Sequence, residues 1–345
     1  MTSVPVPLIH PTRLGWRWVA AGLGVLSVAV VLGALFGPAR IGVGQALSEV
    51  LSVIPFSGVE SPLSDTQREI LWSWRFPRVV LGMLVGSTLA ISGAAYQGVF
   101  RNPLAEPYLL GIASGSALGA TMSFVLELPA LLVPMAFVGG TAAVALTYVL
   151  GRSVGDRTST TLILAGVAMA SFLTALTTFV QQRNTETLRE VFSWVLGRLS
   201  TSGWREVAIL APYAVVSSVV MLLYRRRLDL LAVGDDEAAS LGMDVPRVRI
   251  IVVVAATLGT AAAVAVSGLI GFVGIIVPHA VRLVAGSSYR LVMPLSLLVG
   301  AAFLVGADLI ARLVMSPAEL PIGVVTAFFG APFFLFVLRA SRSGA

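Results

Sequence analysis

The sequence contains no cysteine and no lysine, only two histidines, and few charged residues of any kind. Without cysteine the chain has no disulfide, no thiolate metal site and no cysteine nucleophile. Charged residues make up 12% of the 345 positions, against about 25% in an average soluble domain, whereas 57% are hydrophobic. The composition therefore indicates a polytopic membrane protein. All 23 basic residues are arginine. In a membrane protein such residues indicate which side of the membrane each loop faces, rather than binding to nucleic acid.

Two motifs that carry chemistry are also missing from the sequence. It has no GxxxxGK[ST] phosphate loop, so the chain is not expected to hydrolyse ATP by itself. It has no His-Glu-x-x-His pair, and two histidines are a poor basis for a metal site. We therefore expect no catalytic residue, no metal site and no cofactor on this chain.

Long charge-free runs predict the membrane-spanning helices, because a span needs about 20 apolar residues. The run 250–281 is too long for one helix and contains Gly268, Gly271, Gly274 and Pro278, which interrupt helices. We divide it into two spans. The result is an all-α protein of about ten transmembrane helices in a single domain, 1–345, at 18–39, 79–100, 107–126, 128–151, 158–182, 207–224, 248–266, 270–286, 291–307 and 320–338.

The arginines predict the orientation of this bundle. Ten spans place both termini on one side, and the loops of that side hold fourteen arginines against nine on the other. The positive-inside rule then places both termini in the cytoplasm, with 1–15 as a cytoplasmic tail. The apolar run after Arg17 is too long for a cleavable signal peptide and fits a first span. Two stretches outside the spans, 42–54 and 191–200, predict a surface helix and a segment too short to cross.

One segment stands apart from this apolar background. Residues 225–249, which we call the charged segment, hold five arginines and five acids, ten of the chain's forty charged side chains. Unpaired charges are costly in a bilayer core, so this segment must face water. Asp235 to Glu237 suit the first turn of a helix, Gly242 its C-terminal cap, and Asp244 the N-cap of a second helix. We expect two short cytoplasmic helices at 234–249, either a docking surface or an ordinary solvated loop.

The chain resembles the FecCD family, the iron-chelate, haem and cobalamin permeases of ATP-binding-cassette (ABC) importers. The resemblance covers the chain after about its first 15 residues, and five stretches carry it, in order: RFPRVVLGMLVGSTLAISGAAYQGVFRNPLAEPYLLGIASGSALGA (75–120), LILAGVAMASFLTAL (162–176), GDDEAASLGMDVPRVR (234–249), SGLIGFVGIIVPHAVRL (267–283), and ADLIARL with AELPIGVVTAFFGAPFFLFVLR (307–339). Residues 234–249 also resemble the Glu-Ala-Ala…Gly coupling loop of other importer permeases. The spacing between Glu-Ala-Ala and the glycine is one residue shorter here than in that pattern.

The resemblance implies a type II ABC importer permease in a bacterial cytoplasmic (inner) membrane. It implies a homodimer with two ATPase subunits, which carry the ATP and Mg²⁺, and a periplasmic or lipid-anchored binding protein. The ATPase would dock on residues 234–249, which we call the coupling segment. The site residues expected there are Asp235, Asp236, Glu237, Ala238, Ala239, Leu241, Gly242, Met243, Asp244 and Val245.

Further residues match family positions outside the coupling segment. Arg75, Arg78 and Arg312 match arginines that dock the binding protein; the alternative is that they are snorkelling residues at helix ends. Gate candidates at the cytoplasmic exit are Asn102, Leu104, Ser159 and Thr160, and the alternative for Asn102 and Ser159 is local capping.

A secondary transporter driven by an ion gradient is the competing function. It needs ionisable residues near the middle of the membrane, and Asp308, directly after the charge-free run 291–307, is the only acid that we place in a span. Asp308 lies near the end of that span, where Arg312 is an i,i+4 partner. His279, beside Pro278, fits the cytoplasmic end of a broken helix better than a proton relay. The importer is therefore favoured, and no residue decides between ferric siderophore, haem and cobalamin as cargo.

Overall fold

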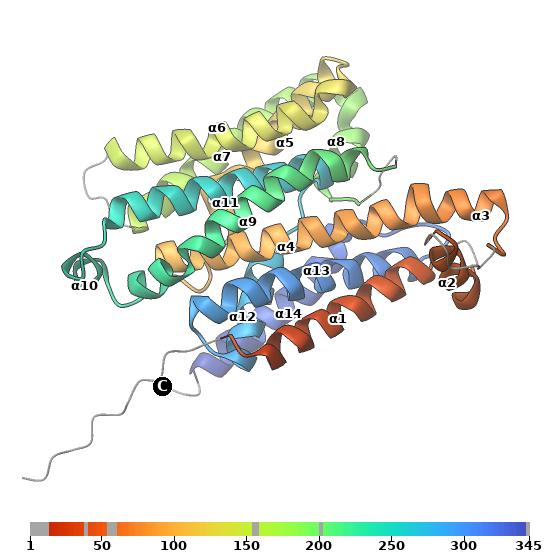
Figure 1. The fold of residues 1–345 in the computed structure, drawn as a ribbon. Helices are drawn as coiled ribbons and strands as arrows, with labels where there is room; N and C mark the ends of the chain where they lie inside the picture. Colours follow the sequence, from red (N-terminus) through yellow and green to blue (C-terminus); the bar gives the residue numbers. More distant parts are fainter. Residues whose placement is uncertain (1–13, 38–40, 54–60, 154–158, 200–202, 343–345) are drawn as a thin grey trace, which may run out of the picture.

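The computed structural model describes residues 14–37, 41–53, 61–153, 159–199 and 203–342, and within these ranges the fold is helical, with no strand. Ten apolar helices occupy the ten predicted positions (Figure 1). They are α1 (Trp16–Leu35), α4 (Phe76–Phe100), α5 (Ile112–Val125), α6 (Leu132–Ser153), α7 (Ser159–Arg183), α9 (Arg205–Leu231), α11 (Val245–Ser267), α12 (Val273–Ala285), α13 (Tyr289–Leu313) and α14 (Ile322–Arg342). Seven are long and apolar enough to cross a membrane by themselves, whereas α5, α12 and the apolar part of α14 are shorter.

The helices form three layers, with α5, α6 and α7 in one, α9 and α11 in the next, and α1, α4, α12, α13 and α14 beyond them (Figure 1). The most buried helix is α4, which packs against α9, α11, α12 and α13. Small residues allow this close packing. A Cβ atom on Gly93 would lie 2.0 Å from the Gly274 carbonyl oxygen, and one on Gly86 would lie 2.2 Å from that of Gly300.

The predicted division of the 250–281 run is confirmed. Helix α11 ends at Ser267 and α12 begins at Val273, with Gly268 and Phe272 at positive φ between them. The Tyr108 hydroxyl donates to the Ile270 carbonyl (3.0 Å) and accepts from the Ile270 amide (3.1 Å). One side chain thus satisfies both backbone groups of Ile270, which an irregular backbone inside a bilayer requires.

Both predicted non-spanning stretches contain helix outside the ten spans. The first contains α2 (Val43–Ser52), and the second begins in α8 (Leu188–Val195), whose eight residues are too few to cross. On α2 the carboxyl of Glu49 is fully buried. Burial raises its pKa, but hydrogen bonds from Ser61, Trp72 and Arg68 outweigh burial and hold the pKa below its usual value. These bonds attach α2 to the turns before α4.

Two segments before the spans complete the fold. A short helix, α3 (Asp65–Glu69), and a π-helical turn, η1 (Ile70–Arg75), run without interruption into α4. A 3₁₀ turn, η2 (Pro107–Leu110), precedes α5. Helices α2 and α3 lie at one end of the bundle, and α10 (Asp235–Ser240) lies at the other, where α1 begins and α14 ends (Figure 1).

The charged segment differs from its prediction in one respect. Arg225 to Arg227 flank the predicted span 207–224 and lie in the last turns of α9, which continues to Leu231. The expected second short helix is wrong, because the helix that Asp244 caps is α11 itself. No glycine occurs between Gly242 and Gly259, so the helix that begins at Val245 continues into the apolar run.

Candidate functional site

The coupling segment forms a compact tip on the bundle. Three acids, Asp235, Asp236 and Glu237, occupy the first turn of α10, where the helix dipole favours negative charge. Gly234 precedes them with φ of +139°, a conformation open mainly to glycine. The predicted start of this helix is therefore confirmed.

The end of α10 has the hydrogen bonds of a Schellman motif. The Gly242 amide donates to the Ala239 carbonyl (2.9 Å), and the Met243 amide donates to the Ala238 carbonyl (3.1 Å). Gly242 has φ of +82°, as a C-terminal cap requires. Asp244 then accepts from the Arg247 amide (3.1 Å) as the N-cap of α11. The predicted capping roles of Gly242 and Asp244 are confirmed.

Ion pairs hold α10 against two spans. The Asp235 carboxylate lies 3.0 Å from an Arg249 guanidinium nitrogen on α11 and 3.7 Å from one on Arg101, directly after α4. Ala238 is fully buried beneath the helix. In contrast, Leu241 is 67% exposed and Val233 is 64% exposed. The tip therefore combines a fixed base with an apolar and acidic outer face.

Asp229, whose role was not predicted from the sequence, ties the end of α9, directly before the tip, to α13. Its carboxylate accepts from the Tyr289 amide (2.6 Å) and the Ser288 hydroxyl (2.9 Å), and it lies 3.4 Å from Arg290. The signal was present in the sequence, because an acid near the C-terminal end of a helix is unfavourable there unless it has another partner. The free amides at the start of α13 provide that partner.

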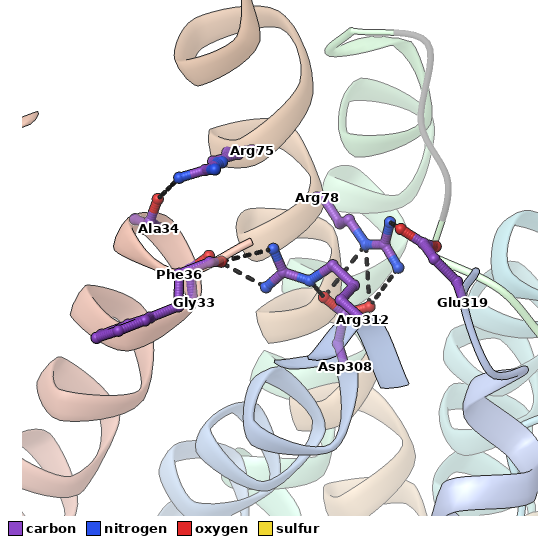
Figure 2. A network of polar contacts seen from close by, with 8 residues as sticks. All are labelled: Gly33, Ala34, Phe36, Arg75, Arg78, Asp308, Arg312 and Glu319. Atoms are coloured by element: carbon purple, nitrogen blue, oxygen red, sulfur yellow. Dashed lines mark hydrogen bonds and ion pairs between the residues drawn. The ribbon is translucent and has the colours of Figure 1, made fainter. Parts of the chain in front are cut away.

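The opposite end of the bundle holds a network of arginines and carboxylates, shown in Figure 2. Asp308 on α13 is 2% exposed, and its carboxylate binds Arg78 (2.8 Å) and Arg312 (3.0 Å). Arg78 also binds Glu319 (2.9 Å), which is 42% exposed. The i,i+4 pairing predicted for Asp308 and Arg312 is confirmed.

Two of the three predicted docking arginines are buried. Arg312 donates to the carbonyls of Gly33 and Phe36 (3.1 and 3.2 Å), and Arg75 donates to that of Ala34 (3.2 Å) (Figure 2). Arg75 also donates to the carbonyl of Leu35 (2.9 Å). Both guanidinium groups therefore hold the end of α1, which neither the docking nor the snorkelling interpretation anticipated. Only Arg78 retains partial exposure.

The gate candidates lie at the end of the bundle that carries α10. Asn102 accepts from the Leu104 amide (2.9 Å), which confirms its local capping role, and Leu104 is 37% exposed. Helix α7 begins at Ser159, but the side chains of Ser159 and Thr160 are outside what the structure describes. These contacts do not test a gating role.

A second polar feature was not anticipated. A cavity of about 890 Å³ lies between η2 and α7. Four polar side chains of α7, at intervals of three or four residues, line it together with Glu106: Ser171, Thr174, Thr178 and Gln182. That spacing places them on one helix face, so the sequence periodicity could have revealed this polar stripe. Among the described residues, no group of three His, Asp or Glu side chains could hold a metal ion.

Comparison with known proteins gives the family. The sequence model of the FecCD transport family matches residues 25–340. A cobalamin import system permease from Halobacterium salinarum is 41% identical over 91% of this chain and 82% of its own length. A hemin transport system permease from Yersinia pestis is 36% identical over 93% and 97%. An inward-facing metal-chelate type ABC transporter superposes with a TM-score of 0.81 at 28% identity, over 94% of this chain and all of that one. The chain therefore belongs to the FecCD transport family and is a multi-pass membrane permease with the type II ABC importer fold.

Proposed function

We propose that this permease carries a large metal chelate into the cytoplasm, driven by ATP that a separate chain hydrolyses. The candidate cargoes are ferric siderophore, haem and cobalamin. Its similarity to permeases for cobalamin and hemin supports the cargo class. The observation that carries the proposal is the tip around α10, which projects an exposed surface from a base fixed to α4 and α11.

The ATPase docks on this tip in our proposal. Leu241 offers an apolar contact, and the exposed Asp236 and Glu237 offer charge for a basic partner surface. A push on α10 reaches α4 and α11 through Asp235. It reaches α13 through α9, which packs against α10 and carries Asp229. This end of the bundle, with both termini, then faces the cytoplasm, as the arginine distribution predicts.

A substrate-binding protein docks at the opposite end. Arg78 is the direct contact that the geometry favours, because its guanidinium is partly exposed beside Glu319. Arg is suited to this role since its planar fork binds carboxylates in a bidentate manner. Arg75 and Arg312 contribute by holding α1 in place beneath the docking surface.

The translocation path runs along α7, between two copies of the chain. Two observations support a homodimer with this interface. The polar stripe of α7 lines the large cavity. Beside it, α7 exposes Leu164, Val167, Phe172 and Phe179. Asn102, Leu104, Ser159 and Thr160 then lie near the cytoplasmic exit of the path as gate residues.

Asp308 argues against the competing secondary transporter. Its carboxylate is 2% exposed and is held by ion pairs to two arginines near one end of α13, whereas a coupling residue is expected near the middle of the membrane. Uptake by proteoliposomes distinguishes the two functions. We expect transport of labelled chelate only with added ATPase, binding protein and ATP. Uptake driven by a proton or sodium gradient without the ATPase would refute the proposal.

The cysteine-free sequence offers a second test of the docking surface. A cysteine introduced by Leu241→Cys is the only thiol in the chain. We expect it to cross-link to the ATPase in the assembled complex. The matched control is Leu128→Cys, an exposed leucine between α5 and α6. Equal cross-linking at both positions would contradict docking at the tip.

A further inference from the structure

Helices α9 and α11 leave an apolar groove along their shared surface. It encloses about 630 Å³, and its walls include three residues from each helix: Tyr213, Val216, Val220, Ile251, Val254 and Leu258. The groove is open, since Val216 is 63% exposed and Val254 is 50% exposed. Both helices are membrane spans, so this surface lies at the depth of the lipid chains.

The groove leads to a polar cavity at the α10 end. On α9, Tyr224 and Arg227 follow Val220 by four and seven residues, and on α11, Arg247 precedes Val254 by seven. These intervals keep all of them on the groove face of their helices. Tyr224, Arg227 and Arg247 line a cavity of about 370 Å³ at this position. The apolar groove therefore ends beside two guanidinium groups.

This cavity carries a net positive charge. The Arg227 guanidinium lies over the Tyr224 ring, 4.5 Å from its centre. Throughout the described ranges, no carboxylate forms an ion pair with Arg227 or Arg247. The one acid in the cavity wall, Asp244, accepts from the Arg247 amide as a helix cap. Two positive charges thus face one carboxylate that is already hydrogen-bonded.

We propose that this groove binds an anionic glycerophospholipid, with an acyl chain between α9 and α11 and the phosphate between Arg227 and Arg247. The dimensions agree. Residues 213–227 of α9 rise about 20 Å, enough for one leaflet of a hydrocarbon core about 30 Å thick plus a headgroup. Arginine forks bind phosphate well, and basic pockets at the cytoplasmic ends of spans suit anionic headgroups.

The bound lipid contacts the coupling segment. Gly242 and Met243, which end α10, line the same polar cavity as Arg227 and Arg247. A phosphate in that cavity therefore lies against the cap of α10 and the first turn of α11. The lipid site does not depend on the cargo or on the direction of transport.

Native mass spectrometry of the full-length permease in detergent tests the site. The probes are phosphatidylglycerol and phosphatidylcholine with identical acyl chains. We expect phosphatidylglycerol to bind preferentially. The double variant Arg227→Gln with Arg247→Gln should weaken its binding roughly ten-fold or more, because hydrogen bonds to charged groups are the strong ones. The matched control is Arg226→Gln, an exposed neighbour that does not line the cavity.

A second variant tests the apolar part without changing any charge. Val254→Trp should fill the groove and reduce phosphatidylglycerol binding, and it should fold normally because Val254 is half exposed. Excess inorganic phosphate should not displace the lipid, because phosphate alone does not use the groove. Equal binding of both lipids, equal loss in Arg226→Gln, or no loss in Val254→Trp would each overturn the proposal. Release of the lipid when the ATPase binds would also overturn it and assign the cavity to that partner.

Discussion

Replacing Asp308 with asparagine tests the buried network between α4 and α13 most directly. The carboxylate is 2% exposed and binds Arg78 and Arg312 at 2.8 and 3.0 Å. Removing one partner of a buried ion pair costs about 3–5 kcal/mol, because the other charge is left uncompensated. In this variant Arg312 still donates hydrogen bonds to the carbonyls of Gly33 and Phe36. We therefore expect the free energy of unfolding to fall by about 3 kcal/mol, near the lower bound of that range.

The free energy of unfolding in mixed micelles, from titration with denaturing detergent, measures this loss. Glu319→Gln is the matched control, because Glu319 binds the same Arg78 but is 42% exposed. An exposed pair contributes about 0–1 kcal/mol, so the two variants should differ clearly. A double-mutant cycle with Arg312→Gln isolates the coupling between Asp308 and Arg312. If Asp308→Asn costs no more than Glu319→Gln, the assigned role of the network is wrong.

Three further predictions concern both ends of the bundle. Leu241→Asp should leave the fold intact, since the side chain is 67% exposed, but should prevent co-purification of the ATPase; unchanged recovery would contradict docking there. Gly242→Val should cost about 1–2 kcal/mol at φ of +82° and should lower hydrogen-exchange protection of α10, whereas Gly242→Asn should be milder. The pKa of Glu49 is lower in the folded protein than its usual value of 4.5. The stabilisation that Glu49 provides should therefore be present above about pH 4.5 and be lost as the pH falls through the pKa of the folded state. Exchange protection factors of α2 should follow that profile in the wild type and not in Glu49→Gln, and identical profiles would contradict the assignment.

The helical architecture could be predicted from the sequence because hydrocarbon imposes long apolar runs. Glycines between 268 and 274 revealed the break between α11 and α12. They did not reveal that Tyr108 binds the backbone of Ile270 in this break, because the two residues are 162 positions apart in the sequence. The second short helix near Asp244 was a wrong prediction for a related reason. A cap shows where a helix begins but not how far it continues.

At the candidate site, the features that depend on neighbouring residues could be predicted from the sequence. The features that depend on packing between distant helices could not. The caps at Gly242 and Asp244 depend on neighbours within a few residues. The burial of Arg75 and Arg312 depends instead on the position of α1, whose carbonyls bind both guanidinium groups. Arginine next to an apolar run is equally typical of a surface contact and of a buried one, so sequence alone could not distinguish them.

The two carboxylates that hold α13 have a mechanical consequence. Asp229 of α9 binds the first turn of α13, and Arg78 of α4 binds Asp308 near its other end. Helices α4, α9 and α13 also pack against one another in all three pairs. Axial sliding of α13 along either neighbour would therefore stretch a short polar bond at one end. These three helices therefore move as one braced unit, and relative motion during a transport cycle is expected where α11 packs against α5 and α6.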